Sequence, residues 1–396
     1  MIPNVQECKS VAPSELISQR VQRKLQSDGY ISTIKSAVEL LARRHIGHLV
    51  FDSMVEYGAV RTLSRSDLQN VAVEMVETTG DSDDGVPQFV SHINEGYVLT
   101  ETGLATTSSF EILEESAGAP DYARQAMMEM FSRELFFGQL PVREIFTTKT
   151  STGTDTLSTV APLIPRYPSN YFHWMVETVP KVRYLQQYKR RTGTEVTVLI
   201  SSNAPPFVEE TLALLEWPKD RILRAVEPMY KVRDLILPSS PERTEADFDW
   251  LRKEILDNVL NEETVTPNGT AKRIYISRAN AMSRRVVNEE EVIDVLSDYG
   301  FKRYLLEDRS LMKNAELFNN ADIVVGPHGA GLTDIIFAEN CTLIEFFGAR
   351  LNKAYESLSK TLGINYKPMY CQADSADIIV NTGRLRQRVN ECIDET

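Results

Sequence analysis

A short apolar run that leads through three glycines into a helical pattern constrains the fold of this chain more than any other stretch. Ile323 to Val325 is β-branched and uncharged, which is typical of a strand buried on both faces of a parallel sheet. Gly326, Gly329 and Gly331 follow at once, and Leu332 to Glu339 predicts a helix. The N–H groups at such a helix start, together with its dipole, favour anions. The stretch therefore predicts an α/β fold with a phosphate site.

The glycine spacing separates this stretch from the dinucleotide sites of dehydrogenases. It is G-x-x-G-x-G and comes late in the chain, whereas dinucleotide enzymes carry G-x-G-x-x-G after the first strand of their domain. Both observations argue against a dehydrogenase. The alternative to a phosphate site is a tight strand-to-helix turn with a core histidine, His328.

Length and composition limit the class of protein. A chain of 396 residues suggests two or three domains, and 42% hydrophobic with 25% charged residues is ordinary for a globular protein. The net charge of −13 argues against nucleic acid as a partner, and four scattered cysteines fit neither a zinc site nor a disulfide framework. No apolar run approaches the ~20 residues of a membrane span, and Met1 to Arg20 lacks a signal-peptide core. We therefore expect a cytoplasmic protein.

The N-terminal part gives helical and then β-like patterns. Helices are predicted at Pro13 to Gln26, at Ser32 to Arg44 and near Asp121 to Phe137. Short β-like segments include Gln69 to Val76 and Glu95 to Thr100. This part is interpreted as a β-rich elaboration.

Asp81 and Asp83 form a D-x-D, the spacing by which many sugar-transfer enzymes hold a metal ion on a nucleotide diphosphate. The motif follows Thr78-Thr79-Gly80 in a run of turn formers. A solvated loop is therefore the favoured interpretation, and no metal site is predicted.

A helix that begins near Tyr171 carries the first candidate for catalysis. A strand at Thr156 to Pro165 precedes it, and Pro180 should kink or break it in the turn after Glu177. His173 and Glu177 are four residues apart and share a helical face. A histidine in a first turn is kept neutral by the helix dipole, so His173 can act as a base. The alternative is a core histidine with an i,i+4 partner.

Strands and helices then alternate, which is typical of parallel sheets. The predicted segments are Glu195 to Ser201, Pro206 to Leu215, Lys231 to Pro238, Thr244 to Glu262, Arg273 to Ser277, Glu289 to Tyr299, Lys302 to Leu306, Leu311 to Asn319, Asp322 to Val325, Thr342 to Phe347 and Lys353 to Leu362. From Arg273 onward the pattern predicts a doubly wound domain.

Two arginines follow the first strand of that domain. Arg278 and Arg285 should lie at the carboxyl edge of the sheet, where ligands of such folds bind, and arginine forks suit phosphate oxygens. A solvated basic loop is the alternative, because Arg284 and Lys302 indicate that not every cation there can be a ligand. Glu345, at the end of a later strand, needs a partner if buried: a ribose diol or a nearby arginine.

With these pieces placed, the chain resembles the family 61 glycosyltransferases. The resemblance rests on three motifs, in order: Tyr171-Phe172-His173-Trp174 with Glu177 and Pro180; Tyr275-Ile276-Ser277-Arg278 with Arg285 and Asn288-Glu289; and Val325-Gly326-Pro327-His328-Gly329-Ala330-Gly331-Leu332. It covers about residues 155–350. The family implies a GT-B architecture of two facing Rossmann-like lobes, inversion at the anomeric carbon and no required metal.

The expected organisation combines this resemblance with the patterns above. Residues 1–150 form a helical start and a β-rich elaboration of the N-terminal lobe, 151–243 an acceptor-side Rossmann-like lobe, 244–270 a linker helix and loop, 271–380 a nucleotide-sugar-binding Rossmann-like lobe, and 381–396 a C-terminal helix. The predicted site residues are His173 and Glu177 for catalysis; Ser277, Arg278, Arg285, Pro327, His328, Gly329, Ala330, Gly331, Leu332 and Glu345 for the nucleotide-sugar; and Tyr171 and Trp174 on the acceptor side.

The expected function is inverting, metal-independent transfer of a sugar from a nucleotide-diphosphate donor to a hydroxyl of a glycan or lipid-linked glycan. No cofactor is predicted besides the donor substrate itself, and peripheral association with a membrane is compatible with the sequence. Two alternatives stay open: a pyruvyl-type transferase acting on polysaccharide, and a non-catalytic nucleotide or glycan binder. Donor, acceptor and linkage depend on a few contacts that spacing does not locate.

Overall fold

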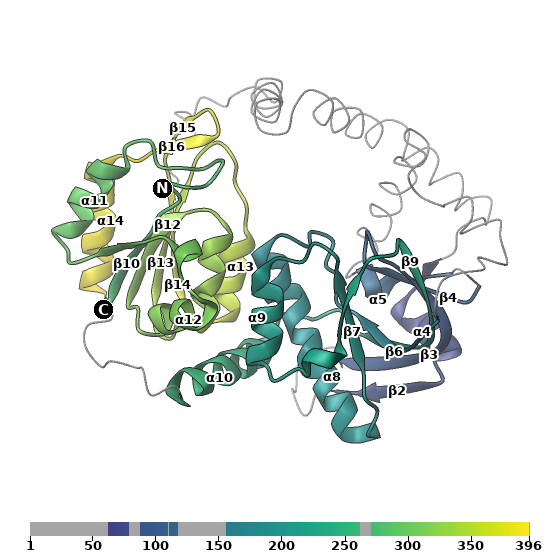
Figure 1. Cartoon of the computed structure of the whole chain (residues 1–396). Coiled ribbons are helices and arrows are strands. Elements are labelled where there is room, and N and C mark those ends of the chain that lie inside the picture. Colours follow the sequence, from purple (N-terminus) through teal and green to yellow (C-terminus); the bar gives the residue numbers. More distant parts are fainter. Residues whose placement is uncertain (1–61, 79–87, 110, 118–155, 262–270, 396) are drawn as a thin grey trace. The chain divides into compact units, whose positions relative to one another are not determined.

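The computed structural model describes residues 62–78, 88–109, 111–117, 156–261 and 271–395. The chain divides into two compact units after Arg243. Each is described by itself below, as labelled in Figure 1. The three predicted N-terminal helices and the D-x-D of Asp81 and Asp83 lie outside the described residues.

The strands of the first unit form one nine-stranded sheet among the described residues. Its elements are β1 (Thr62–Leu63), α4 (Arg65–Val71), β2 (Glu74–Glu77), β3 (Phe89–Leu99), β4 (Leu104–Thr107), β5 (Ile112–Leu113), α5 (Glu114–Ala117), β6 (Leu157–Pro162), the π-helix η3 (His173–Thr178), α8 (Val179–Thr192), β7 (Thr197–Ser201), α9 (Pro206–Leu214), η4 (Lys219–Arg221), β8 (Ile222–Ala225) and β9 (Met229–Pro238). The strand order is β1-β5-β4-β3-β9-β6-β7-β8, with β2 on β3.

This sheet has an antiparallel and a parallel half. Strand β9 runs antiparallel to β3, from Val90 opposite Pro238 to Leu99 opposite Met229, and parallel to β6 on its other side. Strands β6, β7 and β8 continue in parallel. The β-rich elaboration and the Rossmann-like strands therefore share one sheet, with α8 packed on β3 and β9.

The second unit is a doubly wound parallel sheet, as predicted. Its elements are α10 (Glu245–Asn261), β10 (Arg273–Ile276), α11 (Glu289–Ser297), β11 (Lys302–Tyr304), η5 (Leu306–Asp308), α12 (Leu311–Asn319), β12 (Ile323–Pro327), η6 (Ala330–Phe337), β13 (Thr342–Phe347), α13 (Ala354–Thr361), β14 (Asn365–Tyr370), β15 (Gln372–Asp374), β16 (Asp377–Ile379) and α14 (Thr382–Asp394). The parallel order is β11-β10-β12-β13-β14, and β15 and β16 form a separate hairpin. Helices α11 and α14 lie on one face of the sheet, and α12 and α13 lie on the other (Figure 1).

The central strands of the second unit are apolar because both of their faces are covered. Every residue of β12 and β13 is buried. Val325, Ile344 and Phe346 pack in one cluster with Val292 of α11 and Leu385 of α14. This is the burial predicted from the β-branched run before the glycine turn.

Three predictions of local structure need correction. Gln69 to Val76, predicted as β-like, contains the end of α4, which a Ser64 cap starts: the Ser64 N–H donates to Asp67 Oδ2 at 3.0 Å. The helix predicted from Leu332 is a 3₁₀-helix that begins at Ala330. The predicted linker helix α10 packs on α12 and η6, so it belongs to the second unit.

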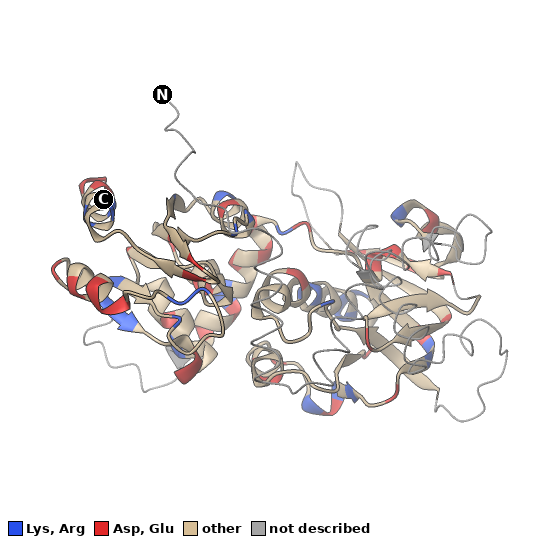
Figure 2. Ribbon diagram, turned by 90° about the horizontal axis from the view of Figure 1, so that it is seen from above, with Lys and Arg blue, Asp and Glu red and all other residues tan. Residues whose placement is uncertain are grey.

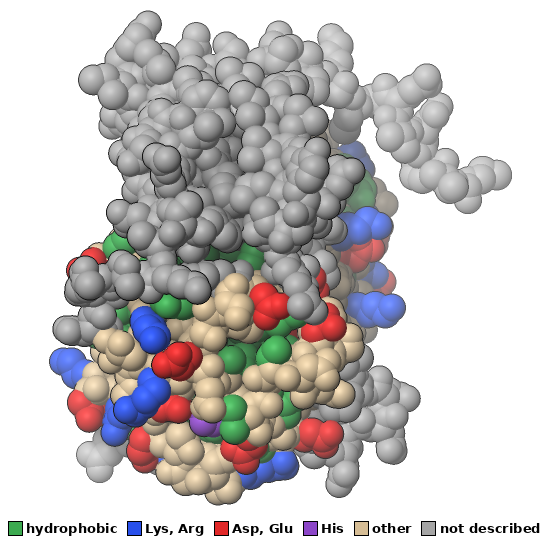
Figure 3. Space-filling model, turned by 90° about the vertical axis from the view of Figure 1, so that its right-hand side faces the viewer, with side chains coloured by type: hydrophobic (Ala, Val, Ile, Leu, Met, Phe, Trp, Pro, Cys, Tyr) green, Lys and Arg blue, Asp and Glu red, His purple; other side chains and the backbone are tan. Residues whose placement is uncertain are grey.

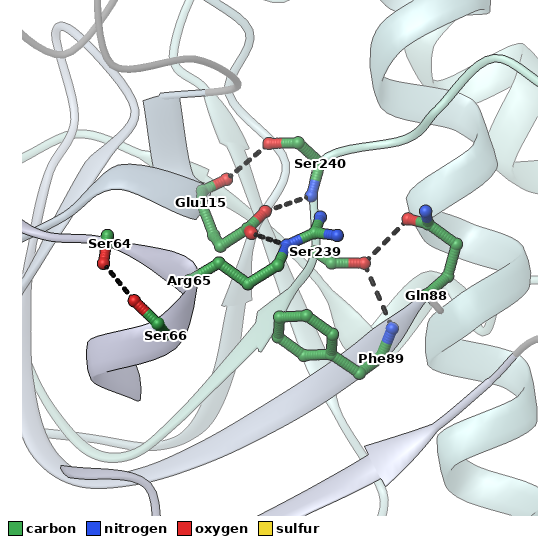
Figure 4. Close-up of polar contacts among 8 residues, drawn as sticks. All are labelled: Ser64, Arg65, Ser66, Gln88, Phe89, Glu115, Ser239 and Ser240. Atoms are coloured by element: carbon green, nitrogen blue, oxygen red, sulfur yellow. Dashed lines mark hydrogen bonds and ion pairs between the residues drawn. The ribbon is translucent and has the colours of Figure 1, made fainter. Parts of the chain in front are cut away.

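A buried polar cluster ties the N-terminal elaboration to the segment after β9 (Figure 4). Glu115, only 6% exposed, accepts from Arg65 Nε at 2.5 Å and from the Ser240 N–H at 2.6 Å. Ser239, which is fully buried, accepts from the Phe89 N–H at 3.1 Å. These bonds fix the start of the segment that leads to Arg243.

Acidic and basic residues are interspersed over both units (Figure 2). The uncovered part of the face in Figure 3 mixes acidic, basic and apolar side chains, so no single sign of charge dominates that view. Within the described residues, no helix combines the length and apolar character needed to cross a bilayer.

Candidate active site

The helix that carries His173 is irregular where the candidate residues lie. Asn170 Oδ1 accepts from the Phe172 N–H at 3.0 Å and so caps the start of the helix. The backbone is π-helical over His173–Thr178 and becomes α-helical at Val179, with Pro180 in the first turn of α8. Proline has no N–H to donate, so the change of helix type falls where the sequence predicts a break. Short π-helical segments are frequent at functional sites.

His173, Glu177 and Arg243 form a connected array. His173 Nδ1 lies 2.7 Å from Glu177 Oε2, and Arg243 Nη2 lies 2.6 Å from Glu177 Oε1. A carboxylate accepts, so it favours the tautomer in which Nδ1 carries the proton and Nε2 keeps a lone pair. Both oxygens of Glu177 are engaged, whereas Nε2 of His173 can receive a proton. The side chains of His173 and Glu177 are 17% and 24% exposed, so solvent reaches both.

Two residues were predicted on the acceptor side. Tyr171 can still contact an acceptor, whereas the prediction for Trp174 is wrong. Trp174 is 0% exposed and belongs to the core, so its ring meets no acceptor. Tyr171 is half-buried and packs edge-on against Phe207, with ring centroids 5.1 Å apart. Tyr167 was not singled out from the sequence, yet it is 43% exposed and its ring lies 5.0 Å from the ring of His173. Its position in a turn before the helix is the signal that would have found it.

The second candidate set lies at the point where the order of the parallel strands reverses. Strand β10 lies between β11 and β12, so the chain leaves β10 toward one side of the sheet and β12 begins the other. In doubly wound sheets, ligands bind at the carboxyl ends of such strands. Arg278 follows β10, and His328 to Gly331 follow β12. The sheet therefore brings two of the three sequence motifs together.

Gly329 makes room for the guanidinium of Arg278. A Cβ at position 329 would lie 2.0 Å from Arg278 Nη1 and 2.7 Å from Cζ. The φ of Gly329 is 173°, an extended angle open to any residue, so the contact and not the backbone angle requires glycine. Arg278 Nη2 donates to the Ser283 carbonyl at 3.2 Å, which holds the guanidinium against the turn.

Arg278 lies close to the charge of Arg284, and Arg284 in turn lies close to the charge of Arg350. Burial lowers the pKa of Arg278, and the charge of Arg284 lowers it further. Burial also lowers the pKa of Arg284, with a further contribution from Arg350. Across the described part of the chain, no carboxylate lies within salt-bridge distance of these three guanidinium groups. Neighbouring cations that lack a carboxylate in direct contact favour an anionic ligand.

Arg285, the predicted ligand, instead has a carboxylate partner. Its Nη2 lies 2.6 Å from Asp377 Oδ2, and this bond raises the pKa of Arg285. Arg284 adopts a left-handed backbone angle, with φ at 60°. Arg284, which the sequence does not predict as a ligand, is the arginine whose charge acts on Arg278.

His328 is held by a fully buried carboxylate. Glu345 is 0% exposed; its Oε1 lies 2.5 Å from His328 Nδ1, and its Oε2 accepts from the Tyr366 hydroxyl at 2.6 Å. The expected ribose or arginine partner of Glu345 is thus replaced by His328 and Tyr366, and the full burial of Glu345 keeps a ribose diol from reaching it. Tyr355 donates to the Gly329 carbonyl at 2.7 Å, and burial raises its pKa, so it stays a donor.

The other predicted donor-side residues differ in what they offer a ligand. Ser277, 4% exposed, donates to Glu289 Oε1 at 2.7 Å, so it positions the start of α11. Pro327 and Leu332 are buried, whereas Ala330 and Gly331 are partly exposed at the start of η6. Backbone groups of Ala330 and Gly331 are therefore the accessible part of the turn.

No group of three or more His, Cys, Asp or Glu side chains suited to a metal ion occurs among the residues that the structure describes. The D-x-D of Asp81 and Asp83 lies outside the described residues, so a reaction that requires no metal ion stays a prediction.

Comparisons with known proteins match part of the chain to glycosyltransferases. Residues 171–344 match the family model described as Glycosyltransferase 61. The chain is 28% identical over 196 residues to the beta-1,2-xylosyltransferase XAX1 of Oryza sativa subsp. japonica, a match that covers 43% of this chain and 33% of the relative.

Other relatives carry a different transferase name. The EGF domain-specific O-linked N-acetylglucosamine transferase of Drosophila melanogaster is 30% identical over 105 residues, which is 26% of this chain and 20% of the relative. Its Bos taurus counterpart is 24% identical over 118 residues, covering 28% and 22%. The chain thus matches a third or less of the length of these relatives, and their names support glycosyl transfer. The resemblance inferred from the three motifs is confirmed, because residues 171–344 match the model of glycosyltransferase family 61.

Proposed function

We propose that the protein is an inverting glycosyltransferase that moves a sugar from a nucleotide-diphosphate donor to a hydroxyl of a glycan or lipid-linked glycan. The observation that carries this proposal is the pair of sites at strand edges of the two units. One offers an oriented imidazole, and the other offers a glycine turn beside three arginines.

The donor diphosphate is assigned to the second unit. Arg278, Arg284 and Arg350 supply guanidinium groups without a carboxylate partner in the described residues, and the start of η6 supplies N–H groups. Guanidinium forks bind phosphate oxygens in pairs, and backbone N–H groups at a helix start add further donors. This arrangement can hold two phosphates and stabilise the charge that develops as they leave.

The acceptor base is assigned to His173. In the proposed step an acceptor oxygen attacks the anomeric carbon, its proton passes to Nε2 of His173, and the bond from the anomeric carbon to the diphosphate oxygen breaks. Glu177 holds Nδ1 and stabilises the imidazolium that forms, while Arg243 keeps Glu177 in place. A single in-line displacement of this kind inverts the configuration of the sugar.

The same proposal covers the roles of the two units, the independence from a metal ion and the cellular compartment. The two units act as the two lobes of a GT-B enzyme, and arginines with helix N–H groups do the work that a metal ion does in D-x-D enzymes. Catalysis occurs in the cytoplasm, with the donor as the only small-molecule requirement.

Transfer assays with a panel of nucleotide-sugars and His173→Ala test the proposal. We expect turnover to fall ~10²–10⁴-fold, the usual range for a positioned base, with unchanged nucleotide affinity. His92→Ala is a matched control, because His92 also pairs with an acid, Asp234, at 3.1 Å and lies on β3 of the same unit. NMR of the product reports the anomeric configuration. Retention of configuration, or full turnover by His173→Ala, contradicts the mechanism, whereas nucleotide binding without transfer supports a binding protein.

A further inference from the structure

A polar pocket in the first unit lies apart from the residues discussed so far. It has a volume of about 440 Å³, within the range of ~300–1,000 Å³ common for small-molecule sites. Ser201 ends β7 and Ala225 ends β8, so these parallel strands supply its floor at their carboxyl ends. The turn from Thr100 to Thr102, between β3 and β4, forms another wall.

The turn that closes this pocket is held by close backbone contact. Gly103 has a φ of 74°, and a Cβ there would lie 2.0 Å from the Ile164 carbonyl oxygen. Thr100 Oγ1 donates to the Glu227 carbonyl at 2.6 Å, which joins this turn to the segment after β8. The walls therefore keep a fixed shape, as a specific site requires.

The polar groups in the pocket match a sugar that bears hydroxyls and no negative charge. Ser201 Oγ donates to Asn203 Oδ1 at 2.6 Å, so the amide nitrogen of Asn203 remains as a donor for a ligand. Two carboxylates, Glu101 and Glu227, line the pocket against one guanidinium, Arg166. Carboxylates accept from sugar hydroxyls and repel anionic sugars.

An exposed apolar side chain lines the pocket, and an aromatic residue adjoins the lining in the chain. Val226, which lines it, is 77% exposed. Tyr167, 43% exposed, sits in the chain between the lining residues Arg166 and Pro168. Sugar rings combine hydroxyl edges with apolar C–H faces, so they fit a polar floor with an aromatic and aliphatic rim.

Tyr167 also connects the pocket to the candidate base. Its ring lies 5.0 Å from that of His173, and the guanidinium of Arg166 lies 5.0 Å from the Tyr167 ring centroid. A glycan held in the pocket and extending along Tyr167 brings a hydroxyl toward His173.

We infer that this pocket binds a neutral sugar unit of the acceptor glycan, an inference that rests on the proposed glycosyl transfer. Five of its lining residues come before residue 171, namely Thr100, Glu101, Thr102, Arg166 and Pro168, and the other seven lie at or after the ends of β7 and β8, within the matched segment. Acceptor choice is thus set partly by residues outside the segment that matches the family model.

Binding of the full chain to an array of neutral gluco-, galacto-, manno- and xylo-oligosaccharides, with matched uronic-acid oligosaccharides, tests the inference. We expect a neutral oligosaccharide to bind, and both Asn203→Ala and Val226→Asp to weaken that binding about tenfold, the effect of losing one hydrogen bond or apolar contact. Val226 is exposed, so its substitution leaves the fold intact. Asn94→Ala, at an exposed position of β3 outside the pocket lining, is the control.

Transfer assays and binding assays together distinguish an error in the pocket assignment from an error in the proposed function. In transfer assays the pocket variants should raise the KM for the acceptor while kcat and the KM for the donor stay unchanged. Binding that persists in both variants, preference for uronic acids, or no neutral oligosaccharide bound overturns the inference even if the protein transfers sugar. Pocket-dependent binding without transfer from any donor supports the pocket and contradicts the proposed transferase.

Discussion

Replacing Gly329 by alanine tests the phosphate site by moving Arg278 without removing it. The added methyl would lie 2.0 Å from Arg278 Nη1 and 2.7 Å from Cζ. The guanidinium is the mobile end of a long side chain, and the extended φ of 173° suits alanine, so the side chain and not the backbone must shift. The variant should therefore fold normally and lose the guanidinium from its place beside the turn.

The expected loss follows from one charge-assisted bond. Such a bond contributes ~1.5–3 kcal/mol, which is roughly 10- to 150-fold in Kd. Gly329→Ala and Arg278→Ala should each weaken binding of a nucleoside diphosphate by an amount in this range. Because both changes remove the same contact, the double variant should lose no more than the larger single effect.

Calorimetry with the nucleoside diphosphate that the wild-type chain binds measures these affinities. Gly383→Ala in α14 is the control, because its Cβ would meet only Asn381 Oδ1, at 3.4 Å, and Arg278 keeps its place. Additive losses in the double variant would mean that glycine and arginine act separately, and the reasoning would be refuted. Unchanged affinity in Gly329→Ala beside a clear loss in Arg278→Ala would refute it as well.

Three further predictions concern the arginines of the donor site, the residues that orient His173, and the need for a metal ion. Arg284→Ala should weaken nucleotide binding by ~1.5–3 kcal/mol and Arg285→Ala by less, because Asp377 already neutralises Arg285; equal calorimetric losses would contradict this order. Glu177→Gln and Arg243→Met should each lower kcat less than His173→Ala does, because they orient the base. A larger loss in Glu177→Gln than in His173→Ala, measured by transfer rate, would make the carboxylate the base. Transfer should survive EDTA, and activity lost to chelation and restored by Mg²⁺ or Mn²⁺ would contradict a metal-independent reaction.

Periodicity and turn chemistry predict the second unit well. The β-branched runs and glycine spacing foresee a parallel sheet with β12 at its centre, since strands covered on both faces must be apolar throughout. Strand β14 and the β15–β16 hairpin were missed, because Asn365–Tyr370 carries a lysine and a proline in its run and reads weakly as a strand.

The side chains of the sites are harder to foresee than the elements that carry them. Arg284 and Arg285 are neighbours, yet Arg285 has a carboxylate partner whereas Arg284, whose backbone angle is left-handed, acts on Arg278. Spacing places His173 and Glu177 on one face, but Arg243, 66 residues later, is brought there by the fold. Trp174 is buried because it lies on the other face of the same short helix.

The limits of the segment that matches the family model do not coincide with the limits of the two folded units. The matched segment begins at residue 171, yet β6 precedes it and forms the link between β9 and β7, while β9 is paired along its length with β3. The segment ends at residue 344, inside β13. A fragment cut to the limits of the match would expose unpaired strand edges on both units and would aggregate instead of folding. The segment that matches the family model therefore carries candidate binding edges, and strands outside it complete the sheets that hold those edges in this chain.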